Sequence, residues 1–172
     1  MALFLSGCGG SDDNNVTNTG PLPAEPLTPA EIITDMEKRG QLPVLERTAS
    51  ISGVDQNNNN IRDDIDQYIA KEYPNVPQQK AAQQLALHLQ HGLEVDKTDL
   101  IQVKKISFEK SRAIGCIYEK FPHASTPAPK DVAKDLIAVT TNTKERLLAY
   151  LAFSKALDGT VLTLAEGDLC DE

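Results

Sequence analysis

The chain has few of the residues that recognise sugars or nucleic acids. Trp is absent from its 172 residues, and aromatic residues make up only 5%. Since bases and sugars stack on aromatic rings, extended carbohydrate binding is disfavoured. Seventeen Lys and Arg stand against 25 Asp and Glu, for a net charge of -8, and no segment gathers the basic residues into a stripe. Such a chain is poorly suited to neutralise phosphates, so no nucleic-acid partner is expected.

Long apolar runs and the motifs of common enzymes are missing too. A run of about 18 apolar residues, the length of a transmembrane helix, does not occur. The sequence also has no Gly-rich phosphate loop and no Ser in a nucleophile elbow. These absences give no indication of a substrate or a reaction.

Apolar residues make up 40% of the chain, enough for one domain with one core. Their spacing is helical, and no strand pattern is strong. Thr28 and Glu31 predict a capping box at the first helix, Gly92 a stop for the third, and Asn142 with Glu145 a capping pair for the last. The expected helices cover about 29–39, 65–73, 77–91, 97–121, 130–140 and 142–157. The sequence predicts an all-α bundle of five to six helices, with residues 28–172 as a single helical domain.

The first 27 residues indicate export. Leu5-Ser6-Gly7-Cys8 resembles the lipobox of bacterial lipoproteins, in which the Cys carries the lipid. We interpret residues 1–8 as the remnant of a signal peptide, truncated because no Lys or Arg precedes Cys8. Residues 9–27 are expected to form a disordered tether. The alternative is a chance Cys after small residues. The resemblance implies a membrane anchor through lipidated Cys8 in the bacterial cell envelope, at the outer membrane and facing the periplasm or the cell surface.

The two remaining cysteines fit an exported protein. Once Cys8 is lipidated, Cys116 and Cys170 leave an even count, and an oxidising compartment allows them to form a disulfide. Helical spacing places Cys116 at the flank of the apolar face of its helix, where a C-terminal tail could reach it. The alternative is a pair of free thiols.

A segment rich in Asn and Asp precedes the second predicted helix and is the most informative part of the sequence. In residues 55–66, oxygen-bearing side chains fall at positions 1, 3, 5, 9 and 12, the spacing by which a 12-residue loop wraps Ca²⁺. The expected ligands are the side chains of Asp55, Asn57, Asn59, Asp63 and Asp66 and the backbone carbonyl of Ile61. The sequence therefore predicts a calcium-type loop before the second helix.

This loop resembles the calcium loops of EF-hands and, more closely, those of thrombospondin type 3 repeats and dockerins. It differs at Asn60, where these loops carry Gly because the turn needs a positive φ, a conformation that Asn tolerates next best. It also differs at Asp66, which is shorter than the Glu of EF-hands. The alternative is an Asn- and Asp-rich turn that only caps the next helix. Because the chain has one such loop and two Met, we expect a structural ion rather than a sensor.

Two histidines offer the main candidate for catalysis. His88 and His91 are three residues apart on a predicted helix, with Glu94 and Asp96 just beyond. This arrangement permits a transition-metal or hydrolytic site, but the Glu of a zinc-protease motif is missing, and solvent-facing histidines are favoured. The leading hypothesis is thus a calcium-binding envelope lipoprotein, a non-enzymatic structural module or one that binds another envelope protein. The competing hypothesis is an envelope hydrolase with a site near His88 and His91.

Overall fold

The computed structural model describes residues 26–161, 163 and 165–171. These residues form six α-helices and no strand, which confirms the predicted all-α fold. The helices are α1 (Pro29–Lys38), α2 (Asp63–Glu72), α3 (Val76–Glu94), α4 (Leu100–Lys120), α5 (Pro129–Thr140) and α6 (Lys144–Ala156).

The chain divides into two compact units, residues 1–41 and 42–172. The first unit contains α1, which begins with the predicted capping box. The backbone N–H of Glu31 donates to Oγ1 of Thr28 at 3.3 Å, and the backbone N–H of Thr28 donates to the Glu31 carboxylate at 2.8 Å. None of the α1 residues is buried. The sequence grouped this helix with the rest of 28–172, whereas the division into compact units falls after Gln41.

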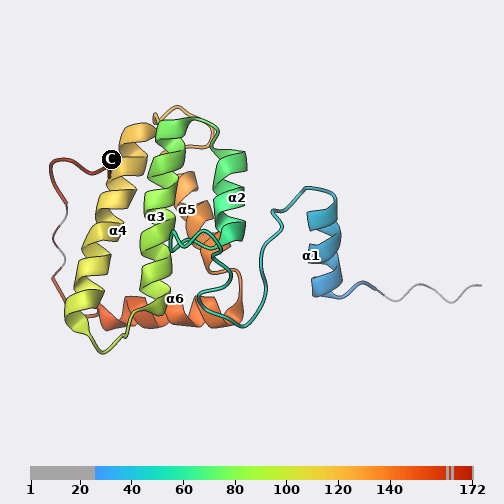
Figure 1. Cartoon of the computed structure of the whole chain (residues 1–172), viewed down its shortest axis with the longest axis horizontal. Helices are drawn as coiled ribbons and strands as arrows, with labels where there is room; N and C mark the ends of the chain where they lie inside the picture. Colours follow the sequence, from blue (N-terminus) through green and yellow to red (C-terminus); the bar gives the residue numbers. More distant parts are fainter. Residues whose placement is uncertain (1–25, 162, 164, 172) are drawn as a thin grey trace, which may run out of the picture. The chain divides into compact units, whose positions relative to one another are not determined.

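The second unit is a helical bundle built around α3 and α4. Figure 1 shows α2, α3, α4 and α5 running along one another, with α6 lying across one end of the bundle. The closest packing is between α3 and α4, and α2, α5 and α6 all pack on α3. Side chains at helical spacing point inward and form one core. Its fully buried members include Ile69, Leu85, Ala113, Ile117 and Leu136.

The third helix does not end at Gly92, so that prediction is wrong. α3 continues to Glu94, and Gly92 is buried within it. A Cβ at this position would lie 3.7 Å from the ring of Phe153 in α6. Gly92 therefore faces Phe153 across the contact between α3 and α6 at an ordinary packing distance.

The predicted capping pair of the last helix is also wrong. Thr143 rather than Asn142 caps α6, and its Oγ1 accepts a hydrogen bond from the backbone N–H of Arg146 at 3.3 Å. Asn142 instead uses its side chain for long-range contacts, because its Oδ1 accepts hydrogen bonds from Arg62 and Arg146. Glu145 lies in the first turn of α6, exposed to solvent.

The C-terminal segment returns along α4 and is joined to it covalently. Cys116 and Cys170 form a disulfide, as predicted, with their Cα atoms 4.9 Å apart. Figure 1 shows the stretch after α6 running back beside α4. Gln84 donates to the carbonyl of Leu169 at 3.0 Å, and the side chain of Leu169 covers Gly115, where a Cβ would lie 2.6 Å from it. The predicted lipid site, Cys8, lies outside the described residues.

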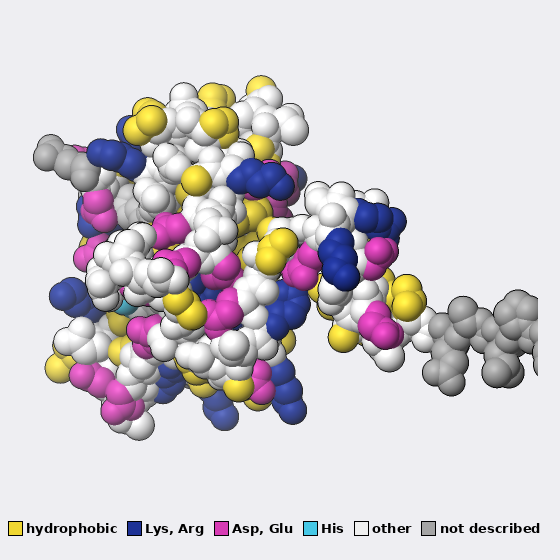
Figure 2. All heavy atoms as spheres, turned by 45° about the vertical axis from the view of Figure 1, so that its right-hand side comes forward, with side chains coloured by type: hydrophobic (Ala, Val, Ile, Leu, Met, Phe, Trp, Pro, Cys, Tyr) yellow, Lys and Arg dark blue, Asp and Glu magenta, His cyan; other side chains and the backbone are white. Residues whose placement is uncertain are grey.

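The surface combines charges of both signs. On the face seen in Figure 2, acidic and basic side chains are interspersed among polar and apolar ones. Among the helices of residues 26–161, none is long and apolar enough to cross a membrane.

Candidate calcium loop and its buried polar support

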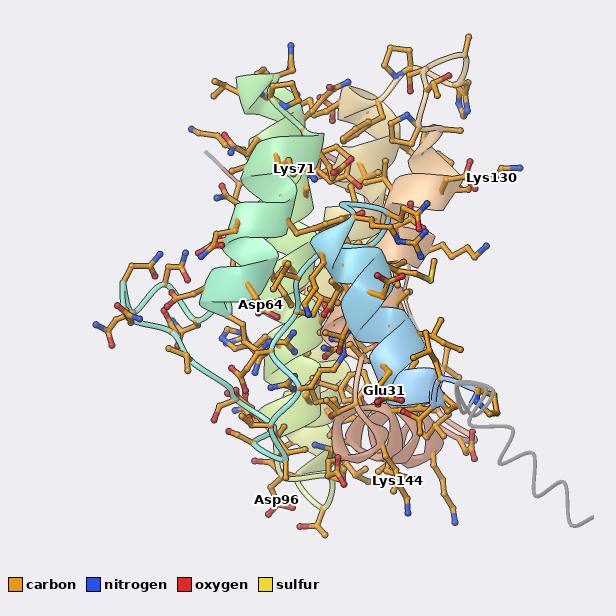
Figure 3. The ribbon with its side chains drawn as sticks, turned by 90° about the vertical axis from the view of Figure 1, so that its right-hand side faces the viewer. Glu31, Asp64, Lys71, Asp96, Lys130 and Lys144 are labelled. Atoms are coloured by element: carbon orange, nitrogen blue, oxygen red, sulfur yellow. A yellow bond between two sulfur atoms is a disulfide. The ribbon has the colours of Figure 1, made fainter. Side chains whose placement is uncertain are left out.

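The loop of residues 55–66 leads directly into α2. Figure 3 shows it projecting beside the N-terminal end of this helix, where Asp64 is labelled. Three carboxylates, those of Asp63, Asp64 and Asp66, lie in the first turn, and Lys71 lies in the last. This distribution of charge complements the helix dipole. The dipole alone accounts for acidic residues in this turn, so the argument for an ion rests on the residues before it and on the environment of Asp66.

Hydrogen bonds from backbone N–H groups to side-chain oxygens hold the loop in tight turns. The carboxylate of Asp55 accepts from the backbone N–H groups of Asn59 and Asn60, at 3.2 and 2.8 Å. Oδ1 of Asn57 accepts from the N–H of Asn59 at 3.0 Å, and Oδ1 of Asn59 accepts from the N–H of Ile61 at 2.8 Å. These bonds hold the side-chain oxygens of Asp55, Asn57 and Asn59, at positions 1, 3 and 5, within successive turns of the loop.

Two residues of the loop adopt positive φ. Asn60 has a φ of 63°, the conformation that the resemblance to calcium loops implied for this position, and Asn58 has a φ of 58°. Asn tolerates this region better than most residues with a side chain. The backbone at Asn60 therefore makes the turn that Gly makes in the loops that this segment resembles.

Asn57, Asn59 and Asp66 meet on the inner side of the loop. Oδ2 of Asp66 accepts from Nδ2 of Asn57 at 3.1 Å and from Nδ2 of Asn59 at 2.7 Å. Its other oxygen, Oδ1, is buried and has no hydrogen-bond partner among the described residues. A buried carboxylate oxygen without a partner costs free energy, so this atom is suited to accept a cation or a water molecule.

The other expected ligands are less closely joined. Oδ1 of Asp63 accepts from the backbone N–H of Gln56 at 3.1 Å, which ties position 9 to position 2. Ile61 supplies a buried side chain, 4% exposed, that anchors the loop in the core. Within the part of the chain that the structure describes, no three His, Cys, Asp or Glu side chains are grouped so that they could hold a metal ion. Asp55, Asp63 and Asp66 are three such residues, so the structure does not bring the three predicted carboxylate ligands into one group of this kind.

A buried arginine on the inner side of the loop connects it to α5. Arg62 is fully buried, and its guanidinium donates to both carboxylate oxygens of Asp64, at 2.9 and 2.8 Å. The same group donates to the backbone carbonyls of Val139 and Thr140 at the C-terminal end of α5, at 3.3 and 3.1 Å. Because the C-terminal end of a helix is the negative end of its dipole, this is a favourable position for a cation.

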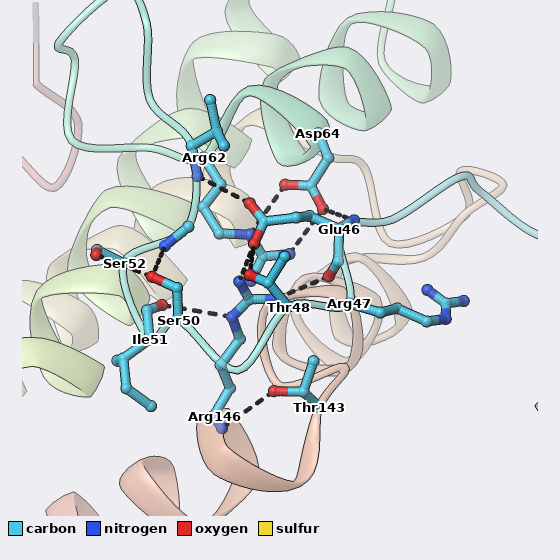
Figure 4. A network of polar contacts seen from close by, with 12 residues as sticks. Glu46, Arg47, Thr48, Ser50, Ile51, Ser52, Arg62, Asp64, Thr143 and Arg146 are labelled. Carbon is cyan, nitrogen blue, oxygen red and sulfur yellow. Dashed lines mark hydrogen bonds and ion pairs between the residues drawn. The ribbon is translucent and has the colours of Figure 1, made fainter.

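A second buried arginine holds the stretch of chain that precedes the loop, and Figure 4 shows this network. Arg146, also fully buried, donates to the backbone carbonyl of Glu46 at 2.8 Å and to its carboxylate at 3.0 Å. It also donates to the carbonyl of Ile51 at 3.4 Å. The backbone N–H of Glu46 in turn donates to Asp64 at 2.8 Å, so both arginines belong to one network.

The ionisation of this network follows from burial and pairing. Burial raises the pKa of Glu46, but hydrogen bonds from the Thr48 hydroxyl, the Val54 backbone and Arg146 lower it below its ordinary value overall. Burial lowers the pKa of Arg146, and the positive charge of Arg62 lowers it further. The carboxylates of Glu46 and Asp64 therefore offset the repulsion between two neighbouring guanidinium groups.

Gly53 lies two residues before the loop and next to both buried arginines. Its φ is 68°, and a Cβ there would lie 2.5 Å from Cδ of Arg62 and 3.0 Å from a guanidinium nitrogen of Arg146. Any side chain at this position would both strain the backbone and displace the buried cations. The network of Arg62 and Arg146 therefore requires glycine at position 53.

The two histidines line a groove of about 600 Å³ on the α3–α4 side of the bundle. Its lining includes His88, His91, Glu94 and Glu109, and the imidazole centroids of the histidines are 6.0 Å apart. Nε2 of His88 is buried without a hydrogen-bond partner among the described residues. Burial lowers the pKa of His88, although the nearby carboxylate of Glu109 raises it. His88 is thus half-buried, with Nε2 shielded, although its ring lines the groove.

Comparison with known proteins identifies no relative. No family model, no curated protein and no solved structure matches the chain. The function has to be argued from the residues of this chain alone.

Sequence reasoning missed the buried arginines and their partners. The bond from Arg146 to Glu46 spans 100 residues, and that from Arg62 to Thr140 spans 78. No local pattern connects positions so far apart, and an Arg in a helix is ordinarily placed at the surface. The one local signal was Gly53, a glycine inside a polar segment that is not part of a predicted hairpin.

Proposed function

We propose that this protein is a calcium-binding lipoprotein of the bacterial envelope, with a structural or protein-binding role and no catalytic one. The single observation that carries the calcium assignment is the unpartnered, buried Oδ1 of Asp66, the carboxylate whose other oxygen, Oδ2, accepts from the amides of Asn57 and Asn59. A cation between these three side chains would supply the missing partner.

The hydrogen bonds of the loop are compatible with such an ion. A carboxamide oxygen has two lone pairs, so Oδ1 of Asn57 or Asn59 can accept a backbone N–H and still bind a cation. Asp55 and Asp63 would add negative charge, which a divalent cation requires and a simple helix-capping turn does not.

The calcium assignment is tested by thermal unfolding of the full chain in calcium and in chelator. Three carboxylates, two carboxamides and no bidentate Glu favour a dissociation constant on the order of 10⁻⁴ M. At a calcium concentration about 100 times this constant, linkage stabilises the fold by roughly 2.7 kcal/mol, which raises the melting midpoint by about 5–10 °C. Mg²⁺ should stabilise much less because it requires octahedral geometry.

The matched variants are Asp55→Ala and Gln56→Ala. Asp55 holds position 1, whereas the exposed side chain of Gln56, at position 2, makes no hydrogen bond within the described part of the chain. The first variant should lose the calcium-dependent shift and the second should keep it. A melting curve indifferent to calcium, or an equal loss in both variants, would mean that residues 55–66 are only a capped polar turn.

The envelope location rests on the lipobox-like segment before Cys8 and on the disulfide, which fits an oxidising compartment. When the protein is expressed from its own chromosomal locus, we expect it to partition into outer-membrane fractions, and Cys8→Ser should release it. Cys170→Ser provides the control, since it removes a thiol without touching the lipid site. Equal membrane association of the Cys8→Ser protein would rule out the anchor.

A role in binding another envelope protein is supported by the exposed face of α6. Leu147, Leu148 and Leu151 are 45%, 54% and 51% exposed. Apolar side chains grouped at helical spacing on a surface are typical of interaction sites.

The groove at His88 and His91 favours a second candidate, an envelope hydrolase, because it brings both imidazoles and two carboxylates into one concave site. Both carboxylates have other partners: Glu109 pairs with Arg112 at 2.8 Å, and Glu94 accepts from Gln90. Assays with chromogenic esters and peptides should therefore give no turnover. Turnover that His88→Ala abolishes and His123→Ala retains would establish the hydrolase instead.

A further inference from the structure

A second groove, of about 550 Å³, lies between α4 and the segment that follows α6. Its apolar wall includes Phe108 and Ile114 from α4 and Leu157 and Val161 from the returning segment. Lys104 and Lys110 also line it. Figure 1 shows the returning segment beside α4. The groove therefore combines an apolar wall with two cations.

Lys110 is half-buried in this part of the bundle, and its ammonium lies beside two aromatic rings. Its ammonium lies 5.1 Å from the ring centroid of Phe153 and 5.6 Å from that of Tyr150. Burial alone lowers the pKa of Lys110, and no carboxylate pairs with it among the described residues. The two aromatic rings offset only part of the cost of burying a charge.

The lining excludes several classes of ligand. Its described residues include no Asp or Glu, so a cation would meet only positive charge there. A strongly hydrated ligand such as a sugar or an inorganic phosphate would leave the apolar wall without a partner. The complementary ligand is an anion that carries an apolar chain.

We propose that this groove binds a free fatty acid, with its carboxylate at Lys110 and its chain along Phe108, Leu157 and Val161. The carboxylate would supply the partner that Lys110 lacks, and the chain would cover apolar surface that is open to water. This site is separate from the calcium loop, and its existence does not depend on the calcium assignment.

The test is isothermal titration of the full chain with decanoate below its critical micelle concentration. Decanol, which has the same chain without the charge, and acetate, which has the charge without the chain, are the comparison ligands. We expect saturable 1:1 binding of decanoate, at least tenfold weaker binding of decanol, and none of acetate. Equal affinity for decanoate and decanol would overturn the proposal. The absence of decanoate binding at about 1 mM would also overturn it.

Variants separate the charge from the wall. Lys110→Met keeps the length of the side chain and should weaken decanoate binding at least tenfold while leaving decanol unchanged. Lys105→Met, on the same helix but outside this groove, is the control and should bind as the unmodified protein does. Ser111→Leu, which fills the groove, should weaken both ligands, with circular dichroism verifying the fold. Retention of full decanoate affinity in Lys110→Met would refute the assigned carboxylate position.

Discussion

Two long segments of the bundle contain no helix among their described residues, namely 42–62 and 157–171. Different interactions attach each of them to the helices. The first is held by two fully buried arginines that donate to carboxylates and backbone carbonyls. The second is held by one disulfide, by a hydrogen bond from Gln84 and by an ion pair between Arg112 and Asp171 at 3.3 Å. The attachment of residues 42–62 therefore depends on charges buried away from water. The attachment of residues 157–171 depends on the oxidation state of the disulfide.

This difference bears on the position of the proposed calcium site, which lies in the first of the two segments and the start of α2. Arg62 connects the loop to α5 from its inner side, so the position of residues 55–66 is fixed by the core rather than by the ion. An ion then has only to order the tip, which limits the conformational entropy lost on binding. A loop attached as the tail is would have no such support.

The largest effect is expected when a buried arginine is removed. Arg62→Ala leaves the carboxylate of Asp64 and the carbonyls of Val139 and Thr140 without their donor, and loss of one partner of a buried pair costs about 3–5 kcal/mol. Urea denaturation provides the measurement, with Lys130→Ala as an exposed control on the surface of α5. A loss below 1 kcal/mol, on the order of an exposed ion pair, would show that the network adds little.

The disulfide comes next. The bridge closes a loop with a sequence separation of 54 residues, for which the chain-entropy model gives about 4 kcal/mol before any strain. Cys170→Ser should therefore lower the free energy of unfolding by about 2–4 kcal/mol and retain the helices, whose core is independent of the tail. Dithiothreitol should destabilise the unmodified protein and leave the variant unchanged. Destabilisation of both to the same extent would point to another thiol-dependent effect.

Two neighbouring aspartates sharpen the comparison between support and ion. Asp64 pairs with Arg62, so Asp64→Ala should lower stability in chelator by about 2–3 kcal/mol and keep the calcium-dependent gain. Asp66 has an unpartnered buried oxygen, so Asp66→Asn should change stability in chelator by less than about 1 kcal/mol and lose the gain. Melting curves with and without calcium test both. If the two variants behaved alike, the loop and its support would be one unit.

The smallest effect concerns pH. Burial lowers the pKa of His88 in the folded protein, so the unfolded chain binds more protons there as the pH falls below about 6.5. Stability should thus be fully present above that pH and decrease below it, and His88→Gln should remove this part of the decrease. His123→Gln, in an exposed loop, should leave it in place. Identical pH profiles of the unmodified protein and His88→Gln would contradict the prediction.

The sequence predicted those parts of the structure that local rules determine. The capping box at Thr28 depends on neighbours within four residues, the helices on apolar spacing, and the turn at Asn60 on a conformation that few residue types tolerate. The error at Asn142 has a long-range cause. Its side chain accepts hydrogen bonds from Arg62 and Arg146, and these contacts override its local preference for the cap position. Gly92 lies buried inside α3 and faces Phe153, a position that local sequence does not reveal.

The contact between Leu169 and Gly115 has a consequence for how the bridge is made. Leu169 precedes Cys170, and Gly115 precedes Cys116, so the contact between Leu169 and Gly115 lies directly beside the bridge. In the language of intramolecular reactions, we expect this contact, when it forms in the reduced chain, to raise the effective concentration of one thiol at the other. The apolar side chain would then favour the pairing that oxidation makes permanent.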